Sequence, residues 1–331
     1  MIIDAHNHLV MSHGSWDEGS AYELPIEAIH DRLRRGDVAG VGLIVGGDRA
    51  FPEMNAGSSW QGTLRALGQV LRGLSRSAGG PSVVRSLGDL EPLSVEEPGL
   101  LFGIEGVTPC FDSAFDDPVT ALHILAQLGV RSVQFLGGTP QPVFETGDSS
   151  LRLSRVGRDL VAEAERLGML IDLAHLGGDE PAFADLLDAV TTPPIASHHS
   201  CRAIAGLPRA LSDDGIRAIA SAEGVIGVNL GSGWLNADGR QGETDDVLRH
   251  VRHIVDLVGV EHVAIGSDHV DAEAVPRDLP DDLFLEGFAG PESLGRVAGA
   301  LAGAGFDSDE CDRILSGNVL RVWRSALGRM E

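Results

Sequence analysis

Short runs of apolar residues recur along this chain, separated by stretches with the spacing of amphipathic helices. The runs are continuous rather than alternating, which is typical of strands buried on both faces of a parallel sheet. Helix-like stretches between them include 156–167, 213–222 and 244–258. Eight strand and helix units in succession predict a (β/α)8 barrel. The predicted strands are 2–5, 42–45, 100–104, 132–135, 169–173, 194–197, 225–229 and 262–265.

One alternative to the barrel is a doubly wound open sheet. That fold usually has a glycine-rich phosphate turn after its first strand, whereas this chain has His6-Asn7-His8 there. The stretch 51–98 is long and loose, with one helix predicted at 62–74 and a Gly-, Ser- and Pro-rich segment near 75–82. We interpret it as an insertion after the second strand, so that residues 1–331 form a single α/β domain.

The composition excludes several functions. With 25 basic and 49 acidic residues, the net charge of −24 argues against nucleic-acid binding. All the basic residues are Arg, which excludes Schiff-base lysines, lysine-containing phosphate loops and metal pairs bridged by a carbamylated lysine. The chain has no leader-like start and no apolar run of about 18 residues. Its three cysteines are far apart and form no CxxC pattern. We therefore expect a cytoplasmic protein that does not bind membranes.

Metal-ligating residue types follow several of the predicted strands. In a parallel barrel all strand ends of one kind meet on one face, where active sites are built. His6 and His8 are two apart on a strand, so both rings project to the same side. Imidazole nitrogens and carboxylate oxygens are ligands of zinc and similar ions. The sequence predicts a metal site from five residues, His6, His8, Glu105, His175 and His198.

Two acidic residues of this face have alternative interpretations. Glu105, between two glycines, is either a helix N-terminal carboxylate or a bridge between two metal ions; we favour the bridge, because no lysine is available. Asp268 is either a turn or cap residue or a catalytic carboxylate that accepts a proton from metal-bound water. We favour catalysis, because the other site residues share its face.

The remaining histidines carry weaker signals. His199 follows His198 directly and should point the other way, which suggests a structural role. His250 and His253 lie beside arginines on a predicted helix, which suggests a solvated face. Candidates for lining a substrate pocket are the loop residues His13 and His269, whereas three histidines are expected away from the site, His30, His123 and His262.

Several stretches together resemble the renal or membrane dipeptidases, peptidase family M19, within the amidohydrolase superfamily. They occur in the family's order over nearly the whole chain, and the segment ending in His175 is the most specific. The matching stretches are 4–7, 104–106, 128–131, 167–175, 194–198, Arg209 with 211–213, 224–229, 266–268 and 317–322.

The resemblance implies a binuclear zinc barrel that hydrolyses dipeptides. In this family's pattern His6 binds one metal ion, Glu105 bridges both, and His175 and His198 bind the second. Asp268 holds the catalytic water or the substrate amine. Arg209 pairs with the substrate carboxylate, which suits its planar guanidinium.

Three positions depart from the family's pattern. His8 stands where the family usually has Asp, and Ala210 where it usually has Asn after the arginine. Gly137 and Gly138 stand where it usually has a Thr-His pair whose histidine polarises the scissile carbonyl. Losing such a donor typically costs about 2.7–4 kcal/mol in barrier, so ordinary dipeptidase activity is in question.

The leading hypothesis is therefore a metal-dependent hydrolase of dipeptidase type. It would use two divalent ions, with zinc expected, on a small substrate that carries a carboxylate and an amide bond. One alternative is another reaction of the superfamily on a small acid or amide, including a one-metal decarboxylation. Another is a catalytically weak metal-binding homologue. The substrate and the oligomeric state stay open, with a homodimer as one option.

Overall fold

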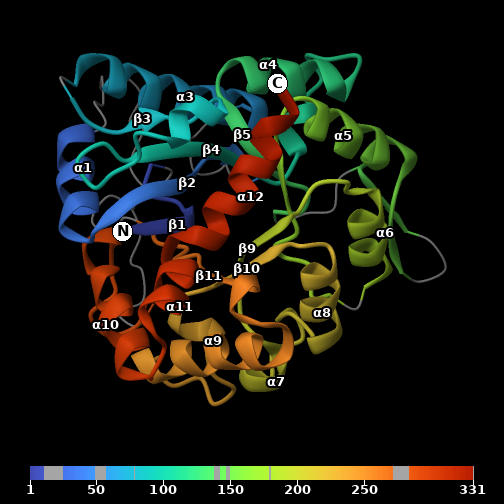
Figure 1. Cartoon of the computed structure of the whole chain (residues 1–331). Helices are drawn as coiled ribbons and strands as arrows, with labels where there is room; N and C mark the ends of the chain where they lie inside the picture. Colours follow the sequence, from blue (N-terminus) through green and yellow to red (C-terminus); the bar gives the residue numbers. More distant parts are fainter. Residues whose placement is uncertain are drawn as a thin grey trace.

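Eight parallel strands form the barrel predicted from the sequence (Figure 1). The computed structural model describes residues 1–10, 25–48, 57–77, 79–137, 142–146, 150–178, 180–270 and 283–330. Each predicted strand overlaps an observed one, and the sheet order follows the chain, which rules out the doubly wound alternative. The order is β1 (Ile2–Asn7), β2 (Val38–Gly47), β4 (Gly99–Glu105), β5 (Val130–Gln134), β8 (Leu170–Asp172), β9 (Ile195–His199), β10 (Val225–Val228) and β11 (Val263–Ile265).

The barrel closes between β1 and the residues that follow β11. Asp268 N donates to His6 O at 3.0 Å, and His8 N donates to His269 O at 2.8 Å. These contacts bring the ends of the first and last strands together, which is where several predicted ligands lie.

Helices surround the sheet, and the predicted ones are present. Ser212 Oγ accepts from Gly215 N at the start of α8, and Ser154 Oγ accepts from Gly157 N at the start of α5, as N-cap residues do. The α-helices are α1 (Ile26–Arg35), α3 (Ser59–Arg76), α4 (Pro118–Gln127), α5 (Arg155–Arg166), α6 (Pro181–Ala189), α7 (Arg202–Ala205), α8 (Asp213–Ser221), α9 (Thr244–Val258), α10 (Gly295–Gly303), α11 (Ser308–Asp312) and α12 (Asn318–Leu327).

Shorter elements complete the described chain. Within the predicted insertion, β3 (Ser82–Val83) pairs with β4. Between β5 and α5, β6 (Phe144–Thr146) and β7 (Leu151–Leu153) form a separate antiparallel pair. A π-helical segment, Arg313–Gly317, precedes α12. Short 3-10 turns occur at Leu87–Leu90, Thr108–Phe111, Ser232–Trp234, Val260–His262, Pro291–Ser293 and Gly328–Met330.

The last helix, α12, covers the barrel opening opposite the predicted site. Trp323 is 1% exposed and packs in one apolar cluster with Ile3 of β1, Leu101 of β4 and Leu170 of β8. Ile3, Leu101 and Leu170 lie in the amino-terminal parts of their strands. The apolar cluster therefore fills the end of the barrel opposite the carboxyl ends of the strands. Among the described helices, none is both long and apolar enough to cross a bilayer.

Candidate metal centre

The predicted ligands converge at the carboxyl ends of the strands around Glu105. Its Oε2 atom lies 2.9 Å from His8 Nε2 and 3.3 Å from His6 Nε2, and the two ring nitrogens are 3.0 Å apart. On its other side, Oε1 lies 3.3 Å from His175 Nε2. His175 Nε2 is in turn 3.1 Å from His198 Nε2. Each oxygen of Glu105 therefore faces a different set of rings.

Asp268 lies at the edge of the same cluster. Its Oδ1 atom is 3.4 Å from His8 Nε2 and 3.9 Å from His6 Nε2, and its Oδ2 accepts from Asn229 Nδ2 at 3.1 Å. The Asp268 side chain is 26% exposed, against 7% for Glu105, so it is the more accessible of the two carboxylates. The backbone of Asp268 is left-handed, with φ 56°, and non-glycine residues in that region are often found at functional sites.

The cluster is buried and strongly charged. Burial opposes ionisation of Glu105, but the rings of His8 and His6 hold the pKa of this carboxyl well below its usual range. Burial also lowers the pKa of His8, yet Glu105 and Asp268 raise it to about 10. Burial lowers the pKa of His198 and leaves its ring neutral, as metal binding requires. The two carboxylates thus favour positive charge among these rings.

One carboxylate oxygen of the cluster has no hydrogen-bond partner among the described residues. Glu105 Oε2 is buried and accepts no aligned hydrogen bond from any described residue, although two ring nitrogens are within 3.3 Å. Two groups of three ligand atoms, each mutually within 4.8 Å, share this glutamate: one with His6 and His8, the other with His175 and His198. The residues present therefore fit divalent metal with nitrogen and oxygen ligands.

Irregular strand pairing helps to bring these side chains together. β1 has a register shift between Asp4 and Asn7 against β2, and β9 has one between Ala196 and His199 against β10. Each shift adds a residue on the ligand-bearing strand, as a β-bulge does, and a bulge redirects a side chain. Strict alternation would have turned neighbouring residues to opposite faces.

The predicted substrate-binding residues have different placements. Arg209 is exposed, and its guanidinium carbon lies 6.0 Å from the ring centre of Trp234. His269 is fully buried: its Nε2 donates to Phe288 O at 2.6 Å, and its ring packs edge-on against Phe284. Because the His269 ring is buried and its Nε2 is bound to Phe288 O, the ring is not presented to a substrate. His13 lies outside the described residues.

The prediction of a solvated face at His250 is wrong. Its ring is 0% exposed, accepts from Cys201 N at 2.9 Å through Nδ1 and donates to Leu235 O at 3.0 Å through Nε2. Arg249 and Arg252 are exposed, whereas the His250 ring lies on the buried side of the same helix. His253 does lie nearer the surface, where it pairs with Asp213 at 2.8 Å. His199 is buried, and burial lowers its pKa to about 3.

Three buried polar residues next to the ligands were not singled out from the sequence. Ser197 contacts the rings of His6 and His198, Asp172 accepts from Ser197 N, and Asn229 contacts Asp268. Ser197 and Asn229 are the last residues of predicted strands and Asp172 is the last but one of its predicted strand. That position was the signal that could have found all three.

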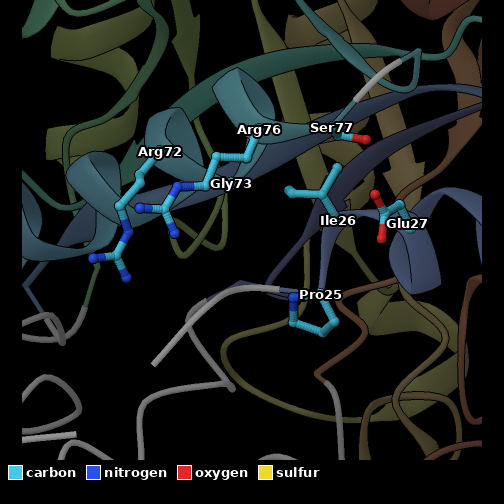
Figure 2. Close-up of a pocket in the computed structure, with 7 residues that line it drawn as sticks. All are labelled: Pro25, Ile26, Glu27, Arg72, Gly73, Arg76 and Ser77. Atoms are coloured by element: carbon cyan, nitrogen blue, oxygen red, sulfur yellow. The ribbon is translucent and has the colours of Figure 1, made fainter. Parts of the chain in front are cut away.

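A separate cavity of about 280 Å³ lies between α1 and the end of α3 (Figure 2). None of the predicted site residues lines it. Its lining consists of Pro25, Ile26, Glu27, Arg72, Gly73, Arg76 and Ser77.

Comparison with known proteins relates the cluster to a family. The sequence pattern of the membrane dipeptidases, peptidase family M19, matches residues 1–328. An uncharacterized protein in the pqqA 5' region of Klebsiella pneumoniae is 31% identical over 264 residues, which cover 76% of this chain and 91% of that protein. The dipeptidase tcpJ of Claviceps purpurea is 28% identical over 228 residues, covering 68% of this chain and 50% of that protein.

The fold is also similar to that of a solved metallopeptidase from Rhodobacter sphaeroides, liganded with a phosphinate mimic of the dipeptide L-Ala-D-Ala. The two share 22% identity with a TM-score of 0.76, and the match covers 100% of this chain and 99% of that one. The chain spans about half the length of the Claviceps relative. Because the family's sequence pattern matches residues 1–328, the chain belongs to the membrane dipeptidase family, peptidase family M19, and is a metal-dependent hydrolase of dipeptidase type.

Proposed function

We propose that this chain binds two zinc ions and hydrolyses an amide bond in a small substrate that carries a carboxylate. The observation that carries the proposal is the position of Glu105, with Oε2 toward His6 and His8 and Oε1 toward His175. One carboxylate placed between two sets of rings is suited to bridging a pair of ions. Bound zinc would acidify a water molecule and polarise the carbonyl of the substrate.

Asp268 is proposed as the group that carries the proton. The rings of His198 and His8 outweigh its burial and hold the pKa of Asp268 below its usual range, so it is ionised at neutral pH and can accept a proton. Asn229 Nδ2 donates to Oδ2 and holds the carboxylate in place. The other oxygen of Asp268, Oδ1, is directed toward the cluster. A carboxylate so placed can pass a proton to a leaving nitrogen.

Arg209 is proposed to bind the substrate carboxylate. It is exposed and close enough to the cluster for its charge to contribute to the lowered pKa of His175, for which burial is the main cause. A planar guanidinium can hold a carboxylate through two parallel hydrogen bonds. The Rhodobacter relative was solved with a dipeptide mimic, which supports a substrate of that size.

We further propose that ordinary dipeptides are poor substrates. Gly137, the first residue of the pair that replaces the family's Thr-His, stands next to the cluster, and a Cβ there would lie 2.5 Å from Glu105 O, so this backbone has no room for the family's threonine. Gly138, at the position of the histidine, lies outside the described residues and carries no side chain. Gly137 N donates instead to Asp48 Oδ2 at 3.2 Å. A carbonyl-polarising side chain would therefore have to come from elsewhere in the chain, and the true substrate should be correspondingly narrower.

Steady-state assays of the zinc-loaded protein on L,L and L,D dipeptides test this proposal. We expect kcat/KM below about 10⁴ M⁻¹s⁻¹, the low end of typical enzymes, with a higher value on a narrower set of small amide-bearing acids. Values above that limit on several unrelated dipeptides would show that the departures at position 8 and at positions 137–138 do not matter. No turnover across a broad amide and lactam panel, with metal content verified, would favour a binding protein.

A further inference from the structure

One hydroxyl group contacts two of the candidate ligands on the sides that face away from the cluster. Ser197 Oγ lies 3.1 Å from His6 Nδ1 and 2.9 Å from His198 Nδ1. The Nε2 atoms of these rings point into the cluster instead. His6 comes from β1 and His198 from β9, which are not neighbours in the sheet. The two rings nevertheless approach to 3.8 Å between centroids.

A buried carboxylate adjoins the same hydroxyl. Asp172 is 3% exposed, and its Oδ1 accepts from Ser197 N at 3.0 Å and from Ala174 N at 3.0 Å. Burial raises the pKa of Asp172, while the His6 ring and both the hydroxyl and the amide of Ser197 act to lower it. One oxygen of Asp172 and one nitrogen each of His6 and His198 lie within 4.8 Å of one another.

Only one arrangement of hydrogens lets Ser197 Oγ contact both rings and also donate to Asp172. A serine hydroxyl has one hydrogen to donate and two lone pairs to accept with. If both Nδ1 atoms carry hydrogen, both donate to Oγ, and the hydroxyl hydrogen is free to point at Asp172. If either Nδ1 lacks hydrogen, the hydroxyl must donate to that ring, and Asp172 keeps only its backbone donors, Ser197 N and Ala174 N. The tautomers of the two rings are therefore linked through this hydroxyl.

We propose that Ser197 is a positioning residue for the metal centre: it accepts from Nδ1 of both His6 and His198, donates to Asp172, and so keeps both Nε2 lone pairs directed at the cluster. The inference rests on the metal binding proposed above. Outer partners of this kind fix the orientation and tautomer of a ligating imidazole. Here one side chain would do so for ligands of both ions at once.

The backbone around Ser197 is adapted to this position. The β-bulge between Ala196 and His199 allows Ser197 and His198, although adjacent, to reach the same group of rings. The displaced carbonyl of Ser197 lies against two glycines of the neighbouring strand region. A Cβ at Gly227 would be 1.9 Å from Ser197 O, and one at Gly266 would be 1.8 Å from it.

The test compares Ser197→Ala and Ser197→Thr with Ser293→Ala as the matched control. Ser293 is also buried, and its hydroxyl donates to Gly290 O outside the cluster. Zinc affinity would be measured on metal-free protein by competition with a chromophoric chelator. We expect Ser197→Ala to weaken both binding steps by about 10- to 100-fold, Ser197→Thr to restore most of the affinity, and Ser293→Ala to change neither step.

A second measurement follows the ring tautomers without metal. In ¹⁵N-histidine spectra of the metal-free wild-type protein, His6 and His198 should carry hydrogen on Nδ1, and Ser197→Ala should show mixed tautomers. Hydrogen on Nε2 of either ring in the wild type, or unchanged zinc affinity in Ser197→Ala, would overturn the proposal. Binding of fewer than two ions by the wild type would count against the proposed function instead. The two proposals can be separated because the ring tautomers are measured in metal-free protein and do not depend on how many ions bind.

Discussion

Single residues decide how this site differs from the pattern of its family. His8 replaces a carboxylate with a ring that lies 2.9 Å from Glu105 Oε2, so two bound ions would be less neutralised by their ligands. A less neutralised metal pair should be a stronger Lewis acid and should favour an anionic substrate. Arg209 adds a further positive charge near the cluster, which suits the same kind of substrate.

The role of Arg209 leads to a prediction about kinetics. Arg209→Met should lower kcat/KM on a carboxylate-bearing substrate by about 10- to 100-fold, because a hydrogen bond to a charged group is worth about 1.5–3 kcal/mol. Most of the loss should appear in KM. Arg217→Met, on the exposed side of α8 where Arg217 pairs with Asp214, is the control. Equal kcat/KM values for the two variants would show that Arg209 does not bind the substrate carboxylate.

At the scale of the elements, the strands were predictable and their irregularities were not. Continuous apolar runs mark strands buried on both faces, and candidate ligands such as Glu105 and His175 could be placed because they follow such runs. Periodicity carries no information about bulges. The sequence therefore did not predict that Ser197 and His198, although adjacent, lie on the same side of β9 and contact the same rings. The burial of His250 and His269 depends on contacts with distant segments, which local sequence patterns do not encode.

The start of α9 provides a prediction about pH. Asp246 is 1% exposed, accepts from Glu243 N and pairs with Arg240 and Arg249. Burial raises its pKa, but Arg240 and the other donors lower it from 3.8 to about 2. A depressed pKa in the folded state means that the carboxylate stabilises the fold above about pH 4, and that this stabilisation is lost as the pH falls toward about 2.

Asp246→Asn should therefore lower the free energy of unfolding by about 1–2 kcal/mol at pH 6, with the difference from wild type shrinking by pH 3. Urea denaturation at both pH values measures it. Asp256→Asn, on the exposed face of the same helix, should lie within about 0.5 kcal/mol of wild type. A difference for Asp246→Asn that does not change with pH would contradict the ionic origin of the effect.

At the scale of the whole molecule, the two ends of the barrel have different roles. The carboxyl ends of the strands hold the cluster of candidate ligands, whereas α12 and Trp323 close the other end. Residues near the two termini of the chain, such as Ile3 and Trp323, therefore lie in one apolar cluster. We propose on this basis that the chain folds as one unit, in which α12 packs against the strands at the end of the barrel opposite the site.

Trp323→Ala tests this arrangement. It should lower the free energy of unfolding by about 3–5 kcal/mol, as other large deletions in protein cores do, and unfolding should remain a single transition. Trp234→Ala is a matched control, because that ring is 40% exposed; it should cost much less. Two separate transitions in denaturant, seen by fluorescence and circular dichroism, would contradict a single folding unit.

The number of divalent ions bound per chain tests the central claim most directly. Elemental analysis after zinc reconstitution and removal of free metal should give about two ions per wild-type chain. Glu105→Gln should give fewer than one, because both groups of ligands lose their shared carboxylate. His199→Ala, which changes a buried ring outside those groups, should retain about two. One ion or none in the wild type, or two ions retained by Glu105→Gln, would contradict a metal pair bridged by Glu105.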